Sequence, residues 1–161
     1  MTKFHRIVLA GLVAFAPLGA AVAEGCIELR TVAEVEQRSM DAQGNLVVRR
    51  VPAAKVVPGT EVIWTVSARN VCQKAADALT IDSPIPEHMA YVADSAAATR
   101  VTVSYSLDGQ RYAGAEALTV READGTVRKA RADEYRAVRF AMNGPLGAGQ
   151  SISAQYRAVV E

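Results

Sequence analysis

Few side chains in this chain of 161 residues could take part in chemistry, and the clearest group is the neighbouring pair His88 and Met89. Imidazole and thioether groups are ligands that copper accepts, and Met40 or Met142 could complete a soft site around them. A single His-Met step in a loop flanked by prolines is more often a surface feature. We therefore expect no metal or other cofactor, and keep a metal- or small-ligand-binding module centred on His88 and Met89 as the alternative interpretation.

No catalytic motif is recognisable. A serine nucleophile needs a base within hydrogen-bond reach, and His88 is the one histidine beyond the first 23 residues. No G-x-S-x-G motif accompanies it. Adjacent acids such as Asp133 and Glu134 are typical of a solvated turn rather than of a general acid and base. The Asp-Gly steps at 108–109 and 124–125 lack the spaced ligands of a calcium loop and are interpreted as turns. We expect a protein that is not an enzyme.

The first 23 residues have the organisation of a signal peptide. Basic residues precede an apolar run over residues 7–15, and the Ala-Val-Ala of residues 21–23 forms an A-x-A cleavage site before Glu24. A membrane-spanning helix over residues 7–23 is one alternative, weakened by a proline and two glycines. Lipidation of Cys26 is another, and the acidic side chain before Gly25 fits it poorly. We expect an exported chain in the periplasm or at the cell surface of a bacterium, without a membrane span after cleavage.

Export would bring the two cysteines, Cys26 and Cys72, into an oxidising compartment with no other thiol to compete for pairing. We predict that they form one disulfide, which closes a loop of about 47 residues and stabilises the fold by roughly 4 kcal/mol. Two buried free thiols are the competing interpretation. A metal site is weaker, because neither cysteine belongs to a C-x-x-C pair.

The charge balance argues against one class of partner. The chain has 18 basic and 17 acidic residues, and no run of basic residues is longer than two. A protein that binds duplex nucleic acid needs a concentrated basic surface, so we expect no nucleic-acid partner. Half of the residues are apolar, which is typical of a folded domain rather than of a disordered chain.

Alternating apolar and polar residues predict β-strands through the rest of the chain. In residues 61–70 the apolar side chains share one face, with Trp64 among them, and polar side chains take the other. The same alternation recurs in three further runs, at residues 100–107, 138–142 and 151–160. Residues 26–40 and 46–51 are expected to pair as a long hairpin around the turn at 41–45, and residues 75–80 are interpreted as another strand.

These runs predict an all-β antiparallel β-sandwich in a single domain, because the strands are short, turn residues separate them, and no long amphipathic helix is present. Trp64 is expected to anchor the core between the two sheets. On that interpretation, Trp64→Ala costs roughly 3–5 kcal/mol.

An ordered set of short motifs runs through residues 57–161: V-P-G-T-E-V-I-W-T-V from Val57, then Asn70, I-D-S-P-I-P from Ile81, Tyr91-Val92, and G-A-G-Q-S-I from Gly147. The set resembles the bacterial conserved repeat domain of unknown function, which occurs in tandem in large cell-surface proteins. The resemblance implies an immunoglobulin-like sandwich exported to the envelope. Here the domain is a single copy, Thr60 replaces the usual acidic residue, and Cys72 lies outside the pattern.

The chain is therefore expected to consist of a signal peptide (1–23) and one domain (24–161), in which an N-terminal hairpin (24–56) precedes the core that the resemblance covers (57–161). Since no catalytic motif is recognisable, we expect a non-catalytic envelope domain that binds another envelope or surface protein. Strand addition at a sheet edge is the expected route, because the edges of a sandwich present unpaired backbone groups.

Overall fold

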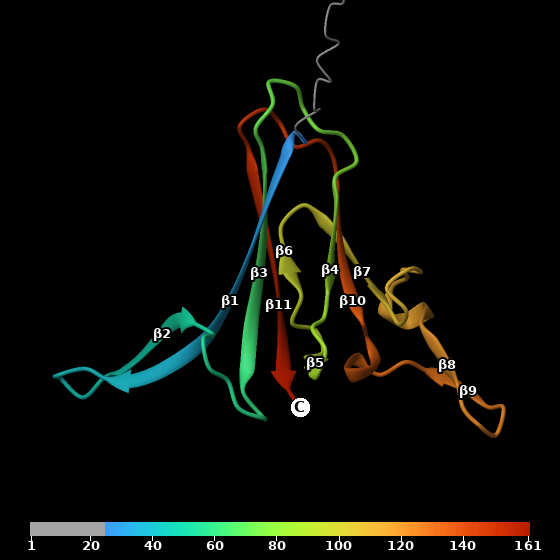
Figure 1. Ribbon diagram of the computed structural model, residues 1–161, viewed down its shortest axis with the longest axis horizontal. Helices are drawn as coiled ribbons and strands as arrows, with labels where there is room; N and C mark the ends of the chain where they lie inside the picture. Colours follow the sequence, from blue (N-terminus) through green and yellow to red (C-terminus); the bar gives the residue numbers. More distant parts are fainter. Residues whose placement is uncertain (1–24) are drawn as a thin grey trace, which may run out of the picture.

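The computed structural model describes residues 25–161, and their regular structure consists almost entirely of β-strands (Figure 1). Two short 3-10 turns, η1 (Ala115–Ala117) and η2 (Ala132–Glu134), are the helical elements of this range. None of the helices described there is long and apolar enough to cross a membrane. The predicted signal peptide, its cleavage site and the alternative of a membrane-spanning helix concern residues 1–24, which lie outside the described part. The other alternative, lipidation of Cys26, concerns a described residue whose sulfur is bonded to Cys72, and a sulfur in a disulfide cannot carry a lipid.

The larger sheet runs in the order β2 (Leu46–Pro52), β1 (Ile27–Met40), β3 (Glu61–Asn70), β11 (Ser151–Val160) and β5 (Met89–Tyr91). A two-residue strand, β6 (Ala97–Ala98), also pairs with β11. Every pairing is antiparallel. The longest ladders join β3 to β1 on one side and to β11 on the other, so β3 lies in the middle of this sheet.

The smaller sheet contains β4 (Thr80–Pro84), β10 (Ala137–Met142) and β7 (Val101–Ser106), with β10 in the centre. A separate hairpin of β8 (Thr119–Arg121) and β9 (Val127–Lys129) projects at one end of the molecule (Figure 1). Its turn contains Gly125 at φ +88°, a backbone conformation that glycine adopts at little cost. The predicted all-β antiparallel sandwich is confirmed.

The core lies between the two sheets and is formed by the apolar faces that the alternation predicted. From the larger sheet it takes side chains of β3, β5 and β11, and from the smaller one side chains of β4 and β10. Its buried members include Val62, Val66, Ile81, Tyr91, Val138, Phe140, Ala154 and Tyr156. Tyr91 packs against Tyr105, Tyr135 and Tyr156 at centroid distances of 5.3–6.1 Å, and Tyr105 stacks on Tyr135 at 4.6 Å. A cluster of aromatic rings therefore forms part of the core.

The predicted disulfide is confirmed and lies at one end of the sandwich. Cys26 and Cys72 are bonded, with their Cα atoms 5.1 Å apart. Beside the bond, the buried Asn70 donates from Nδ2 to the carbonyls of Lys74 (2.7 Å) and Leu146 (2.8 Å) and accepts from the amide of Cys72 (3.0 Å). One side chain thus joins the loop after β3 to the loop before β11.

The prediction of a strand over residues 75–80 was wrong for most of that range. Residues 75–79 form a loop with one isolated bridge, Ala76 to Leu146, and β4 begins at Thr80. Ala78 has φ 52°, in the left-handed region, which interrupts an extended strand. Asn70 holds the start of this loop through Lys74, so side-chain hydrogen bonding replaces the expected ladder.

Candidate interaction surface

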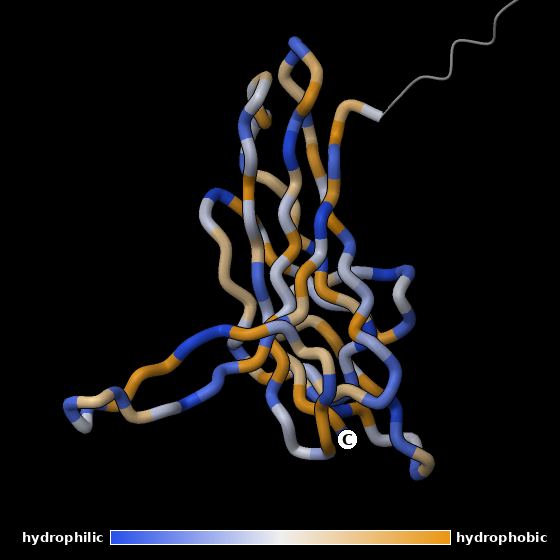
Figure 2. Tube along the Cα trace, turned by 60° about the vertical axis from the view of Figure 1, so that its left-hand side comes forward, coloured by the Kyte–Doolittle hydropathy of each residue, from blue (hydrophilic) through white to orange (hydrophobic). Residues whose placement is uncertain are grey.

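The most prominent feature of the surface is a hairpin that leaves the sandwich. β1 has 14 residues and two different partners: Ile27 to Glu34 pair with β3, whereas Glu34 to Met40 pair with β2. The second half of β1, the turn and β2 therefore extend beyond the larger sheet (Figures 1 and 2). We call this hairpin, residues 35–52, the arm.

The tip of the arm is held in one conformation by Asp41. Its carboxylate accepts hydrogen bonds from the amides of Gln43 (2.9 Å) and Asn45 (2.8 Å) and from Asn45 Nδ2 (3.1 Å). These bonds to the charged form hold the pKa of Asp41 below its ordinary value. Gly44 takes φ +80° and completes the turn. The arm therefore presents a preformed tip rather than a loose loop.

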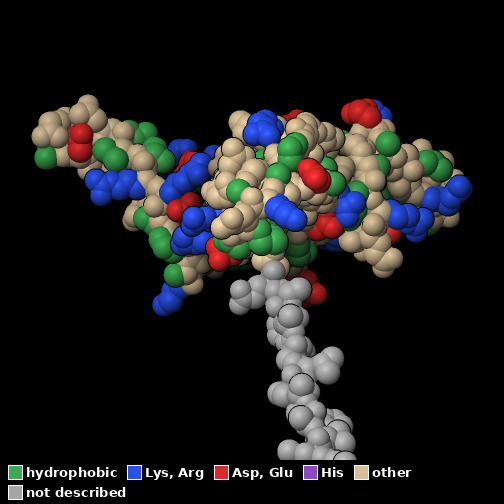
Figure 3. All heavy atoms as spheres, turned by 90° about the horizontal axis from the view of Figure 1, so that it is seen from above, with side chains coloured by type: hydrophobic (Ala, Val, Ile, Leu, Met, Phe, Trp, Pro, Cys, Tyr) green, Lys and Arg blue, Asp and Glu red, His purple; other side chains and the backbone are tan. Residues whose placement is uncertain are grey.

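One face of the arm is apolar near the tip. The register places Met40 opposite Leu46 and Arg38 opposite Val48, so these four side chains point to the same side. Met40, Leu46 and Val48 are 70%, 60% and 49% exposed. Figure 3 shows hydrophobic side chains in green along the projecting arm, between charged groups. Three exposed apolar side chains on one preformed face have no folding partner, which makes the face a candidate contact surface.

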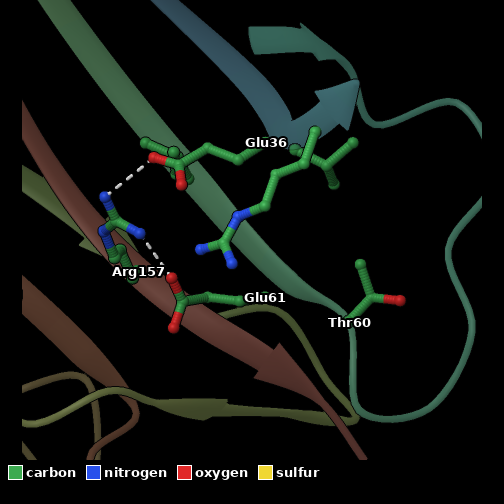
Figure 4. A pocket seen from close by; sticks show the side chains of 7 residues that line it. Glu36, Thr60, Glu61 and Arg157 are labelled. Atoms are coloured by element: carbon green, nitrogen blue, oxygen red, sulfur yellow. Dashed lines mark hydrogen bonds and ion pairs between the residues drawn. The ribbon is translucent and has the colours of Figure 1, made fainter. Parts of the chain in front are cut away.

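The base of the arm is fixed by polar contacts to the larger sheet. Arg157 of β11 donates to Glu36 of the arm (3.1 Å) and to Glu61 of β3 (2.5 Å) (Figure 4). Hydrogen bonding to Glu61 is the main cause that raises the pKa of Arg157 above its ordinary value. Arg50 donates to Gln155 at 3.2 Å nearby. The arm therefore leaves the sandwich in a defined direction.

Beneath these contacts is a cavity of about 330 Å³ lined by Val35, Glu36, Arg38, Thr60, Glu61, Ile63 and Arg157. Its two arginines and two glutamates balance in formal charge, and its acids are already engaged with Arg157. The cavity is thus part of the anchor of the arm.

An apolar slot opens at the side of the sandwich, between β1 and β4. It has a volume of about 300 Å³, and its lining combines side chains of both sheets: Leu29, Thr31, Trp64, Val66, Ile81, Asp82, Ser83, Pro84 and Pro86. Leu29, at its rim, is 61% exposed. The slot exists because β1 and β4 are neighbouring edges of two separate sheets, and no strand of residues 25–161 closes the side between them.

The strand edge beside the slot is open as well. Residues 27–32 of β1 pair with β3 on one side, while β2 reaches only as far as Glu34 on the other. Beyond it, the amide of Ala53 still donates to the carbonyl of Ala33 (3.0 Å). From Ile27 to Val32 no partner strand of the described chain lies on the outer side. Such an edge is a template for a further strand.

Trp64, the expected core anchor, is partly buried and packs against the core from the wall of the slot. Its Nε1 is shielded from solvent and has no hydrogen-bond partner in the described residues. The fully buried aromatic side chains are Tyr156 and Phe140. The expectation from the strand pattern placed Trp64 on the correct face, but it could not tell that this face opens into a slot beside β1.

The candidate metal residues are divided between the core and the surface. The Met89 side chain is buried in the core, and β5 pairs it with Val160. His88 is exposed with φ 61°, and its carbonyl accepts the amide of Glu161 (2.9 Å). Met40 lies at the tip of the arm. Within residues 25–161 there is no cluster of three or more His, Cys, Asp or Glu side chains that could hold a metal ion.

The adjacent acids Asp133 and Glu134 belong to an ion-pair network between η2 and the β8–β9 hairpin. Glu134 accepts two hydrogen bonds from Arg128 at 2.7 Å and one from the amide of Arg131 at 2.7 Å. Asp133 pairs with Arg131 at 3.1 Å. These contacts attach η2 to the β8–β9 hairpin, so both carboxylates serve the fold.

Three comparisons with known proteins, against family models, curated proteins and solved structures, return no match for this chain. The resemblance of residues 57–161 to the conserved repeat domain therefore stays a prediction from the motifs.

Proposed function

We propose that this protein is a non-catalytic, exported domain of the bacterial cell envelope that binds another protein through the arm and the open edge of β1. The observation that carries the proposal is the arm itself: a preformed hairpin with Met40, Leu46 and Val48 exposed on one face. A hairpin whose apolar side chains face away from any core gains little from them within one chain. It gains from them when a partner covers that face.

The charges on the arm support a protein partner in a defined register. Arg49 and Arg50 are consecutive residues of β2, so each face of this edge strand carries one positive charge. Charged residues on an edge strand oppose indiscriminate pairing. They leave pairing favourable where an acidic residue lies opposite. The confirmed disulfide agrees with export, because such bonds persist in oxidising compartments.

A shortened arm tests the proposal. Replacing residues 36–50 by Asn-Gly joins Val35 to Val51, which already face each other across the hairpin, through a two-residue turn. The variant should fold, with unchanged far-ultraviolet circular dichroism and an intact disulfide, and should lose the complex that the native protein forms in solubilised envelope on a native gel.

The matched control shortens the β8–β9 hairpin in the same way. Asn-Gly replaces the residues between Val120 and Arg128, which also face each other. This variant should keep the complex. Persistence of the complex without the arm, or its absence from the native envelope, would contradict the proposal.

A further inference from the structure

We propose that the partner of the arm is a second copy of this chain, and that β2 of one copy adds to the open edge of β1 in the next. This inference rests on the proposed function, because it assigns the occupant of the same surface. The arm supplies exposed apolar side chains and a free strand edge, and the slot region supplies an apolar cavity beside another free edge. The apolar side chains of the arm could therefore cover the apolar slot while the two free strand edges pair.

The arm cannot fill the slot of its own chain. Leu29 at the slot and Met40 at the tip lie on the same strand, eleven residues apart. At about 3.3 Å per residue, an extended strand separates them by roughly 36 Å. The contact between the two surfaces is therefore possible only between copies.

The backbone phase of both edges restricts the register. Because the carbonyl of Ala33 bonds to Ala53 on the outer side of β1, alternation directs the backbone groups of Ile27, Leu29 and Thr31 to that same side. On β2, the backbone groups of Val47, Arg49 and Val51 point toward β1. By alternation, the backbone groups of Leu46, Val48 and Arg50 point outward. An antiparallel ladder must pair these two outward sets.

One register pairs these outward backbone groups and also brings apolar and oppositely charged side chains together. Pairing Leu29 with Val48 places Thr31 opposite Leu46, on the face that carries the slot. The same register places Glu28 opposite Arg49 at a position without hydrogen bonds, where side chains of neighbouring strands approach most closely. A slip of two residues in one direction would oppose Arg30 with Arg49, and a slip in the other direction would place Val47 opposite Glu28 and lose its pairing with Arg49. The first register is therefore the one of the three that forms an opposite-charge pair.

Pairing of two arms through their β2 edges is disfavoured by the same charges. In antiparallel β2–β2 pairing with substantial overlap, Arg49 and Arg50 of one copy lie opposite or diagonal to those of the other, and like charges at such positions are destabilising. The arm-to-edge contact is heterologous, since it joins different surfaces of the two copies. It generates a closed ring or an open chain of molecules, depending on the rotation between copies.

A charge-exchange cycle tests this contact. The exported protein is followed by sedimentation velocity from micromolar to millimolar concentration, as the native chain, Glu28→Arg, Arg49→Glu and the double variant. We expect concentration-dependent species larger than the monomer. Each single variant should weaken the association at least about fivefold, because a favourable pair becomes a like-charge pair, and the double variant should restore it. Arg121→Glu, on the other hairpin, serves as the control and should leave association unchanged.

A monomer at every concentration would overturn the inference, as would assemblies that the charge exchanges leave unaffected. If the isolated protein is monomeric and the envelope complex contains a different protein bound through the arm, self-assembly is refuted while the proposed function stands. If every arm variant loses the envelope complex while the isolated native protein is monomeric, self-assembly is again refuted and the proposed function stands.

Discussion

At the scale of single residues, Asn70 shows the limit of what the sequence predicts. It is the last residue of the alternating run 61–70, and it was one of the motifs of the family resemblance. The structure adds that its buried side chain makes three hydrogen bonds to two loops. The partners are backbone groups, which have no sequence signature. The role of Asn70 could therefore not be derived before the loops were placed.

Replacing Asn70 by Ala should lower the free energy of unfolding by about 2–4 kcal/mol, since buried backbone groups lose their partners. Urea unfolding of the variant measures the loss. Asn143→Ala is the control: this exposed side chain accepts one bond, from Thr102 (2.9 Å), and its removal should cost less than about 1 kcal/mol. Equal effects of the two substitutions would contradict the role given to Asn70.

The aromatic residues should differ in what they contribute to stability. Phe140 is 0% exposed at the centre of the smaller sheet, so Phe140→Ala should cost about 3–5 kcal/mol. Trp64 forms the wall of an open slot, and Trp64→Ala should cost less than about 3 kcal/mol. Trp64→Phe should be close to neutral, because it removes an indole N–H that has no partner. Thermal unfolding of the three variants checks this order, and a larger loss at Trp64 than at Phe140 would refute it.

At the scale of elements, the alternating pattern predicted the strands well and their pairing only in part. The hairpin of residues 26–40 and 46–51 is present as β1 and β2. The projection of this hairpin from the sheet was not predicted. Local periodicity does not show that the pairing of β1 with β3 ends at Glu34, where its pairing with β2 begins. The arm, the open edge and the slot all follow from that exchange. They could not be derived from local patterns.

The disulfide lies at the opposite end of β1 from the arm, and this position determines what its removal should do. The pairs from Ile27 to Glu34 with β3 separate Cys26 from the arm, so the arm should stay attached without the bond. The Cys26→Ser, Cys72→Ser variant should lose roughly 4 kcal/mol of stability. Limited proteolysis should detect new cleavage near Gly25, and cleavage first within residues 41–45 would show that the bond governs the arm.

The β8–β9 hairpin should loosen in acid. Hydrogen bonds from Arg128, and then from the amide of Arg131, lower the pKa of Glu134 to about 2 from an ordinary value of 4.5. A lowered pKa in the fold means that the stabilisation is complete above the unfolded pKa and is lost as the pH falls through the folded one. The protection factors of the amides of residues 119–129, which correct for the pH dependence of intrinsic exchange, should therefore fall between about pH 4.5 and about pH 2. Glu134→Gln should have lower protection factors already at neutral pH and lose this transition, whereas an unchanged transition would assign it to another group.

At the scale of the whole molecule, the sandwich carries the arm at one end of β1, and the outer edge of the other half of the same strand is open. The folded part satisfies its core with buried aromatic and branched side chains. Of the exposed large apolar side chains, Met40, Leu46 and Val48 share one face of the arm and Leu29 lies at the rim of the slot, whereas Val56, Val57, Val71 and Val127 are exposed elsewhere. This distribution makes the arm and the open edge, rather than a pocket with catalytic groups, the surface from which we infer function.

The most direct measurement is site-specific photo-crosslinking in the native envelope. A photoreactive residue at Val48, on the apolar face of the arm, should give a discrete crosslinked product. The same residue at Val127, which is 56% exposed on the β8–β9 hairpin, should give none. Crosslinking from Val127 alone, or from neither position, would contradict a protein-binding role of the arm.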